Sequence, residues 1–204
     1  TLYGQKGTYV ELSAISPQVQ NAVISTEDRT FYSNGGFSIK GILRSALNYV
    51  IHHGQIMGGG STITQQLAKN TLLTQKQTML RKAQELFMAI QLNKVYSKQD
   101  ILAMYLNNAY FGNGVWGVQD AAKRYFGKNA SQLDASEGAI LAGMLRNPSY
   151  YNPADHKDNA ISRRNVVLQL MVDNHKLTQA QANAAKAQSV QVVDAFSNAN
   201  AQKY

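Results

Sequence analysis

Signals for the start and the end of α-helices recur along this chain, and they constrain its fold more than any other feature. Ser16 precedes Pro17, a residue that suits the first position of a helix. Asn147-Pro148 favours the end of a helix, because the residue before a proline disfavours the helical conformation. Three further pairs have the spacing at which two side chains can cap the start of a helix: Thr62 and Gln65, Ser97 and Asp100, and Asp134 and Glu137. The sequence therefore predicts a mainly helical chain.

Apolar spacing adds to these signals and sets the approximate extent of the helices. The expected helices begin at 16, cover 38–51, begin at 62, cover 78–96, 97–109 and 118–127, begin at 134, and include two more within 158–190. In the helix over 78–96, Leu80, Ala83, Phe87 and Ile90 share one face. The glycine-rich segment GQIMGGG, 54–60, is expected to form a hinge or lid.

Composition narrows the class of protein and of partner. The 204 residues, of which 44% are hydrophobic, suit one domain or two small lobes. The formal net charge of +8 favours an anionic partner, such as nucleic acid, a phosphate-bearing substrate or a membrane surface. Cysteine is absent, which excludes disulfides and thiolate metal sites. No apolar run approaches the roughly 18 residues of a membrane span, so we expect a soluble or peripheral chain, or a piece of a longer one.

The segment ISTEDRTFY, 24–32, places three charged residues at the end of the first expected helix. Glu27 follows Val23 by four residues, so it lies beside the apolar stripe of that helix. Apolar surroundings disfavour the charged form of a carboxylate, which makes it a better proton acceptor near neutral pH. The alternative is that Glu27, Asp28 and Arg29 form a solvated helix end without a chemical role.

A polar stripe follows the glycine-rich segment. Thr62, Gln65, Gln66 and Lys69 have the spacing of one helix face, beginning at a helix N-terminus. The hydroxyl and amide groups of this stripe could form hydrogen bonds with sugar hydroxyls. The ammonium group at its end could bind phosphate oxygens. The alternative is an ordinary wet helix surface.

The segment LRKAQE gathers opposite charges on the next helix. Arg81 and Lys82 precede Glu85 by four and three residues, so all three can meet on one surface. Two cations and an acid could hold a pyrophosphate, with a divalent ion bridging to the acid. The alternative is a plain salt bridge. Together with Glu27, this cluster indicates glycosyl or phosphoryl chemistry, and the chain lacks the motifs of P-loop, GxSxG and HExxH enzymes.

Five segments carry a family resemblance: EDRTFYSNGG, GGSTITQQLAKN, RKAQELFMAIQL, KQDILAMYLNNAYFGNGVWGVQDAAKRYFGK and EGAILAGMLRNPSYYNP. In this order they resemble the motifs of the peptidoglycan glycosyltransferase family, the transglycosylase domain of bifunctional class A penicillin-binding proteins and of monofunctional transglycosylases. The match runs nearly continuously from Val23 to Pro153. It implies an all-α fold with a lysozyme-like large lobe, a smaller membrane-facing jaw lobe and a cleft between them. We expect one domain over 1–204, with the jaw lobe and a mobile loop at about 37–77.

The resemblance also implies a reaction. Members of the family polymerise lipid II, an undecaprenyl-pyrophosphate disaccharide-pentapeptide, into β-1,4-linked glycan with inversion at the anomeric carbon. Glu27 matches the general base, which takes the proton from the 4-hydroxyl of the acceptor sugar, and Asp28 would help to position or polarise the site. Glu85 matches the second acid, which assists at the departing pyrophosphate. These two glutamates are the expected catalytic residues.

Further residues match the family's substrate-binding positions. Cations near a pyrophosphate stabilise the charge that develops as it leaves. The residues matched are Lys69, Arg81 and Lys82 around the pyrophosphate, Thr62, Gln65 and Gln66 of the polar stripe, Ser61 directly before the stripe, and Arg44 after the first motif.

The expected cofactor is a divalent metal ion, Mg²⁺ or Mn²⁺, with Glu85 as its protein ligand. The expected partners are lipid II, the growing glycan chain and the outer face of the cytoplasmic membrane, and nucleic acid is not expected. The resemblance places the protein at the extracytoplasmic face of the bacterial cell membrane, anchored by a segment absent from this chain. A transpeptidase domain in the full-length protein and inhibition by moenomycin are implied in the same way.

Three positions depart from the family pattern. Asn34 stands where histidine is usual, and Thr30 stands where arginine is frequent. Gln77 stands where many members have a basic residue, and Lys76, one position earlier, could substitute for that residue. Neither acid is affected, so we expect activity with altered substrate or inhibitor contacts, and we assign Asn34 no catalytic role.

The segment SALNYVIHHGQIM, 45–57, supplies several apolar side chains between the first motif and the glycine loop: Leu47, Tyr49, Val50, Ile51, Ile56 and Met57. We expect it to rest in the membrane and to admit the lipid tail, with the core of a small lobe as the alternative.

Two other functions stay open at this point. One is a lysozyme-like hydrolase of the same glycan, since two carboxylates suffice for that reaction. Lys69, Arg81 and Lys82 argue against it, because a neutral glycan offers no pyrophosphate to bind. The other is a non-catalytic helical module that binds nucleic acid through its charge. Cations grouped near acids and amides, without interleaved aromatic residues, argue against that function.

Overall fold

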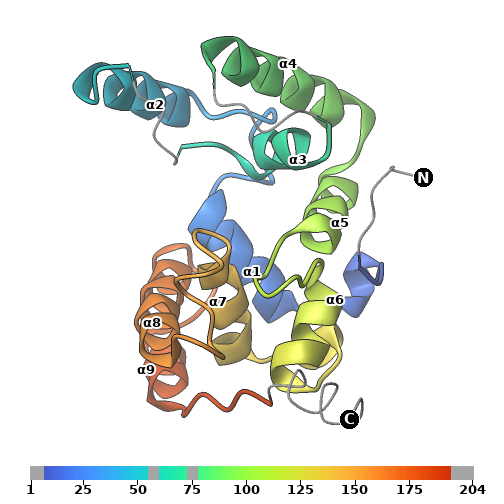
Figure 1. Cartoon of the computed structure of the whole chain (residues 1–204), viewed down its shortest axis with the longest axis vertical. Coiled ribbons are helices and arrows are strands. Elements are labelled where there is room, and N and C mark those ends of the chain that lie inside the picture. The colour runs from blue at the N-terminus through green and yellow to red at the C-terminus, as the bar shows by residue number, and fades with distance from the viewer. Residues whose placement is uncertain (1–6, 55–59, 73–77, 194–204) are drawn as a thin grey trace, which may run out of the picture. The chain divides into compact units, whose positions relative to one another are not determined.

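The computed structural model describes residues 7–54, 60–72 and 78–193 (Figure 1). Its α-helices are α1 (Pro17–Glu27), α2 (Ile39–Ile51), α3 (Ile63–Leu72), α4 (Met79–Val95), α5 (Lys98–Asn108), α6 (Val118–Ala121), α7 (Ala135–Met144), α8 (Lys157–Asp173) and α9 (Gln179–Ala187). Short 3₁₀ turns cover Leu12–Ala14 and Ala130–Gln132, and a π-helical segment covers Ala122–Phe126. Because these described ranges contain no strand, the expected all-α fold is confirmed.

The helix-start signals act as the sequence predicts. The hydroxyl of Ser16 accepts a hydrogen bond from the backbone N–H of Gln18, at 3.2 Å, with Pro17 at the first helical position. Reciprocal capping boxes begin α3 and α7, and the Ser97 hydroxyl accepts from the N–H of Asp100. These caps satisfy N–H groups that would otherwise lack intrahelical partners. They explain why the predicted helix starts lie within about a residue of those observed.

The chain divides into two compact units. Among the described residues, unit 1 contains those within 30–105, and unit 2 contains 7–29 and 106–193. Unit 1 thus holds α2, α3, α4 and most of α5, and unit 2 holds α1, α6, α7, α8 and α9. The narrower boundaries expected for a jaw lobe, about 37–77, stay a prediction. The expected hinge or lid lies largely outside the described residues, which omit 55–59.

Unit 2 is built around α7, which packs against α1 and α8, while α9 packs against α8 (Figure 1). Every residue of α7 from Gly138 to Met144 is buried. A Cβ at Gly138 would lie 3.1 Å from the backbone of Val19, so glycine lets α7 approach α1 closely. Buried Arg164 on α8 donates to the Ser136 hydroxyl and to the carbonyl groups of Lys186 and Gln188. The Arg164 contacts join α7, α8 and the end of α9, and α1 packs against α7 and α8.

In unit 1, α3 packs against α4. Ile63, Leu67 and Ala68 of α3 and Ala89 of α4 are buried between them. The apolar face shared by Leu80 and Phe87 does not contribute to this core, because the two side chains are 71% and 64% exposed. The buried residues of α4 are instead Glu85 and Ala89.

Two glycines of unit 1 bring separate segments into close backbone contact. Gly36 adopts a φ of 90°, and a Cβ there would lie 2.7 Å from the carbonyl oxygen of Ala89 on α4. Gly41 on α2 faces Gly60. A Cβ added at Gly41 would lie 2.1 Å from the carbonyl oxygen of Gly60. A larger residue at either position would displace backbone, so glycine is required. The contact at Gly60 fixes the residue directly before Ser61.

Candidate active site

The end of α1, in unit 2, carries two of the predicted site residues, Glu27 and Asp28. Val19, Ala22 and Val23 bury one face of this helix. The helix ends after Glu27 because Asp28 leaves the helical conformation, with a φ of −163° and a ψ of 82°. Asp28 is 7% exposed and Glu27 is half-buried. The pair is therefore not a fully solvated helix end.

Contacts with the end of α8 hold this segment in place. The Arg29 guanidinium donates to the carbonyl oxygen of Asp173 at 3.0 Å, and the Asn174 amide donates to the hydroxyl of buried Ser25 at 3.2 Å. Ser25, two positions before Glu27, and Arg29, two positions after it, are thus both hydrogen-bonded to the end of α8. A general base benefits from such fixed placement, because proton transfer requires hydrogen-bond distance to the acceptor hydroxyl.

The polar stripe begins at Thr62, which belongs to unit 1. The Gln65 side-chain oxygen accepts from the N–H of Thr62 at 2.8 Å, and the Thr62 hydroxyl accepts from the N–H of Gln65 at 3.1 Å. The Thr62 hydroxyl also donates to the carbonyl oxygen of Gly36 at 2.7 Å. Thr62 and Gln65 are 1% and 3% exposed, so they are not part of a wet helix surface. In this structure they fix the N-terminus of α3.

Ser61, Lys82 and Glu85 form a polar cluster, which we name the Glu85 cluster. The Lys82 ammonium lies 2.9 Å from Oε1 of Glu85 and donates to the Ser61 hydroxyl. The Ser61 hydroxyl in turn lies 3.4 Å from the same carboxylate oxygen. Glu85 is 3% exposed, whereas the Lys82 side chain is 28% exposed. The cluster thus combines a buried acid with an ammonium that partly faces solvent.

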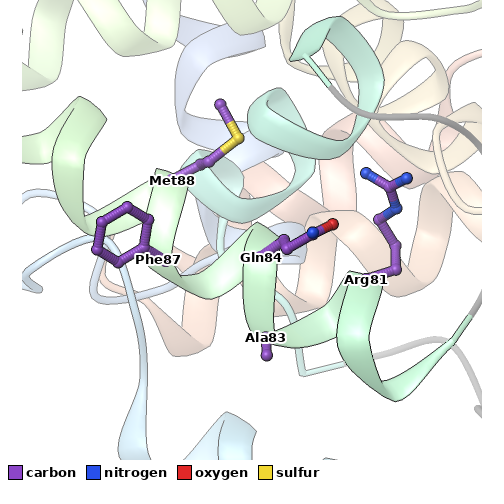
Figure 2. A pocket seen from close by; sticks show the side chains of 5 residues that line it. All are labelled: Arg81, Ala83, Gln84, Phe87 and Met88. Carbon is purple, nitrogen blue, oxygen red and sulfur yellow. The ribbon is translucent and has the colours of Figure 1, made fainter.

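The expected binding residues of unit 1 occupy different environments. Gln66 and Lys69 are half-buried on α3, and Arg44 is exposed on α2. Arg81 is half-buried one position before Lys82. It lines a surface depression of about 630 Å³ along α4, together with Ala83, Gln84, Phe87 and Met88 (Figure 2). This depression contains neither Glu85 nor Ser61, so we do not assign it as the active site.

The structure thus brings together some of the predicted site residues within each unit. Ser61, Lys82 and Glu85 are in direct contact, and Thr62 and Gln65 cap the helix that follows Ser61. Glu27 and Asp28 are adjacent in unit 2. Lys76 and Gln77 lie outside the described residues.

Two contacts near these residues were not expected from the sequence. The Tyr105 hydroxyl of α5 donates to Oε1 of Gln66 at 2.9 Å. The Lys98 ammonium donates to Oδ1 of Asn34 at 3.1 Å and lies 4.9 Å from the centre of the Phe31 ring. Asn34 also accepts from the N–H of Gly36, at 3.0 Å. Asn34 therefore contributes to the order of the segment after Thr30, and its lack of a catalytic role stays a prediction.

A metal ion would have few protein ligands here. Across 7–54, 60–72 and 78–193, no group of three or more histidine, cysteine, aspartate or glutamate side chains could hold one. Mg²⁺ is often bound by one or two carboxylates, with substrate phosphates and water completing its shell. A metal ion at Glu85 stays a prediction, because this carboxylate is 3% exposed and is already paired with the Lys82 ammonium. No described helix is both long and apolar enough to cross a membrane.

Comparison with known proteins gives a consistent result. The family model described as transglycosylase matches residues 1–172. Penicillin-binding protein 2a of Streptococcus pneumoniae is 56% identical over 171 residues, which are 84% of this chain and 23% of that protein. Penicillin-binding protein 1A of Escherichia coli is 41% identical over 189 residues, which are 92% of this chain and 22% of that protein. The chain therefore spans less than a quarter of the length of these relatives.

A solved structure supports the fold. The crystal structure of penicillin-binding protein 1A from Haemophilus influenzae superposes with a TM-score of 0.57 and 22% sequence identity. The match covers 96% of this chain and 21% of that protein. The helical architecture is therefore shared along nearly the whole chain.

Proposed function

The chain belongs to the transglycosylase family, the glycosyltransferases of peptidoglycan synthesis, and we propose that it polymerises lipid II into β-1,4-linked glycan strands with inversion. The observation that carries this proposal is the Glu85 cluster. A buried carboxylate there is paired with an ammonium that is 28% exposed, beside the capped start of α3. The partly exposed Lys82 ammonium can donate to a pyrophosphate leaving group, whereas hydrolysis of neutral glycan would not need such a donor.

In the proposed reaction, Glu27 takes the proton of the acceptor's 4-hydroxyl group. The oxygen then attacks C1 of the donor sugar, and the bond between C1 and the pyrophosphate oxygen breaks. Undecaprenyl pyrophosphate leaves with the bonding electrons, and attack from the opposite face inverts C1. The half-buried environment of Glu27, next to buried Asp28, supports its role as the base.

Lys82, Arg81 and Lys69 would bind the pyrophosphate as charge develops on it. Preorganised cations stabilise such a transition state without reorganisation during the reaction. Glu85 holds the Lys82 ammonium 2.9 Å away and thereby fixes its position. A Mg²⁺ or Mn²⁺ ion bound by Glu85 would supply further positive charge to the leaving group. Thr62 and Gln65 would act indirectly in this proposal, by fixing the backbone after Ser61.

We propose that α2 faces the outer surface of the cytoplasmic membrane. Its apolar side chains include Leu43, Leu47, Val50 and Ile51, which are 63%, 59%, 72% and 56% exposed. Lys40 and Arg44 on the same helix are also exposed, and the chain carries a net charge of +8. An amphipathic surface with basic residues suits an anionic membrane interface. Ile56 and Met57, which were expected to contribute, lie outside the described residues.

The relatives named above are penicillin-binding proteins several times longer than this chain. We propose that the full-length protein carries a transpeptidase domain and a membrane anchor in addition to this segment. It would then act at the extracytoplasmic face of the bacterial membrane, with lipid II and the growing glycan as partners. Moenomycin is the corresponding candidate inhibitor.

The proposal is tested by incubating the chain with labelled lipid II and Mg²⁺ in detergent and resolving the products by size. A ladder of polymer with release of undecaprenyl pyrophosphate is expected. Incubation with preformed glycan serves as the second arm. Shortened glycan in that arm, without any polymer from lipid II, would contradict a transferase and favour a hydrolase.

A further inference from the structure

A series of hydrogen bonds runs from α5 to Glu85 and passes through the backbone of Ser61. Tyr105 is 3% exposed, and its hydroxyl donates to Oε1 of Gln66 at 2.9 Å. Nε2 of the same amide lies 3.4 Å from the carbonyl oxygen of Ser61. The Ser61 hydroxyl contacts both Lys82 and Glu85. Gln66 therefore connects the Tyr105 hydroxyl to the Glu85 cluster within unit 1.

Contacts at both ends of the Gln66 side-chain amide hold it in place. An amide has an acceptor end and a donor end, and a tyrosine hydroxyl can hold the acceptor end. With Oε1 held by Tyr105, Nε2 is the end that reaches Ser61. A rotated amide would present its NH₂ group to the Tyr105 hydroxyl and its oxygen to the Ser61 carbonyl, where two acceptors repel. The Ser61 carbonyl, which can only accept, thus selects the orientation of the amide, and the buried hydroxyl of Tyr105 holds the oxygen end of the amide in place.

We propose that Tyr105 is a positioning residue for the transferase reaction and acts through Gln66 on Ser61 and the Glu85 cluster. This inference rests on the proposed function, because it assigns the cluster to the departing pyrophosphate. It changes the part expected of Gln66, whose amide supports the Ser61 backbone. The placement of Lys82 relative to the leaving group then depends on the Tyr105 hydroxyl, although that hydroxyl does not contact the substrate.

The test compares Tyr105→Phe with Tyr125→Phe, since both replacements remove a buried hydroxyl and keep the ring. Tyr125 is 1% exposed in unit 2, and its hydroxyl donates to the carbonyl oxygen of Phe111 at 2.7 Å. Both variants should lower Tm. Only Tyr105→Phe should lower kcat for lipid II polymerisation, by about tenfold to a hundredfold, with KM nearly unchanged, because small misplacements of catalytic groups have effects of that size.

Two double variants separate positioning from general loss of stability. Tyr105→Phe combined with Gln66→Ala should lower kcat no more than the larger single effect, because both changes remove the same support. Tyr125→Phe combined with Gln66→Ala should lower kcat as Gln66→Ala does alone. If Tyr105→Phe does not fold, Gln66→Glu replaces it. That carboxylate still accepts from Tyr105 but no longer donates to Ser61, so the same loss of kcat is expected.

An activity-independent measurement distinguishes this inference from the proposed function. Amide hydrogen exchange in peptides that cover Gly60–Leu67 should be faster in Tyr105→Phe than in wild type, and unchanged in Tyr125→Phe. If wild type makes no polymer, the proposed function fails and the exchange rates still decide whether Tyr105 orders Ser61. A Tyr105→Phe variant with wild-type kcat, or with exchange at Gly60–Leu67 equal to that of Tyr125→Phe, would overturn the inference.

Discussion

Lys82 and Glu85 form an ion pair with 2.9 Å between Nζ and Oε1, although the carboxylate side chain is only 3% exposed. A buried charge is stable only when it is paired and hydrogen-bonded. Lys82, three residues earlier on α4, provides the ion pair for Glu85. The Ser61 hydroxyl provides a hydrogen bond to the same carboxylate. The pair therefore holds an acid inside unit 1 and keeps an ammonium partly accessible.

Removing the ammonium should cost more stability than neutralising the acid. Lys82→Met leaves Glu85 buried without its cation, so we expect a loss of about 1–3 kcal/mol in the free energy of unfolding, less than for a fully buried pair. Glu85→Gln should cost less than about 1 kcal/mol, because the uncharged amide needs no counter-ion. Urea unfolding measures both values. Each variant should lower kcat by at least about a hundredfold.

A surface ion pair provides the matched control for these variants. Lys128 lies 2.9 Å from Glu137, and its side chain is 45% exposed. Lys128→Met should change the free energy of unfolding by less than about 0.5 kcal/mol. A loss in Lys82→Met no larger than that in Lys128→Met would show that Glu85 does not depend on its cation.

The Thr62 hydroxyl should be essential to the start of α3. It accepts from the N–H of Gln65 and donates to the carbonyl oxygen of Gly36, so Thr62→Val loses two buried hydrogen bonds at nearly constant volume. We expect a loss of about 2 kcal/mol in the free energy of unfolding. Thr62→Ser keeps the hydroxyl and should lose less than about 1 kcal/mol. Equal losses in the two variants, measured by urea unfolding, would mean that the methyl group matters more than the cap.

Tyr125 should make stability fall at alkaline pH. Burial raises its pKa to about 12 from the usual 10.0. The unfolded chain therefore releases the phenolic proton first, and the contribution of Tyr125 is complete below pH 10 and is lost as the pH rises towards 12. The difference in unfolding free energy between wild type and Tyr125→Phe should shrink by about 1.4 kcal/mol per pH unit across that range. A difference that stays constant would contradict the shifted pKa.

The exposed face of α2 should bind membranes. Replacing Leu47 and Ile51 by serine removes two side chains that are 59% and 56% exposed, so folding should be little affected. We expect binding to anionic liposomes, measured by co-sedimentation, to weaken at least about tenfold. Val166→Ser on α8, at a site 46% exposed, is the control and should bind as wild type does. Unchanged binding of the double variant would remove α2 from the membrane contact.

Local features of the fold could be predicted from the sequence, because helix caps depend on residues only three positions apart. Thr62 with Gln65 and Asp134 with Glu137 form the expected capping boxes. The sequence did not indicate the π-helical segment Ala122–Phe126. Nor does periodicity indicate which face of α4 packs inward, since Glu85 is buried through its pairing with Lys82 while Leu80 is exposed.

Within the candidate site, helix spacing predicted the contact between Lys82 and Glu85, but it could not predict contacts between residues far apart in the sequence. The contact between Tyr105 and Gln66 joins residues 39 positions apart, and that between Lys98 and Asn34 joins residues 64 apart. Neither pair has a sequence spacing that indicates contact, because only the tertiary fold brings the partners together. The roles of Glu27 and of the metal ion rest on the family resemblance and stay predictions.

The most direct test of the account is the rate of lipid II polymerisation by Glu27→Gln. The amide cannot accept the proton of the acceptor hydroxyl, so we predict a loss of at least about a hundredfold, with Tm close to that of wild type. Glu11→Gln, which changes an exposed carboxylate before the Leu12–Ala14 turn, should polymerise at the wild-type rate. A wild-type rate in Glu27→Gln would contradict the assignment of the general base, and with it the mechanism proposed for this chain.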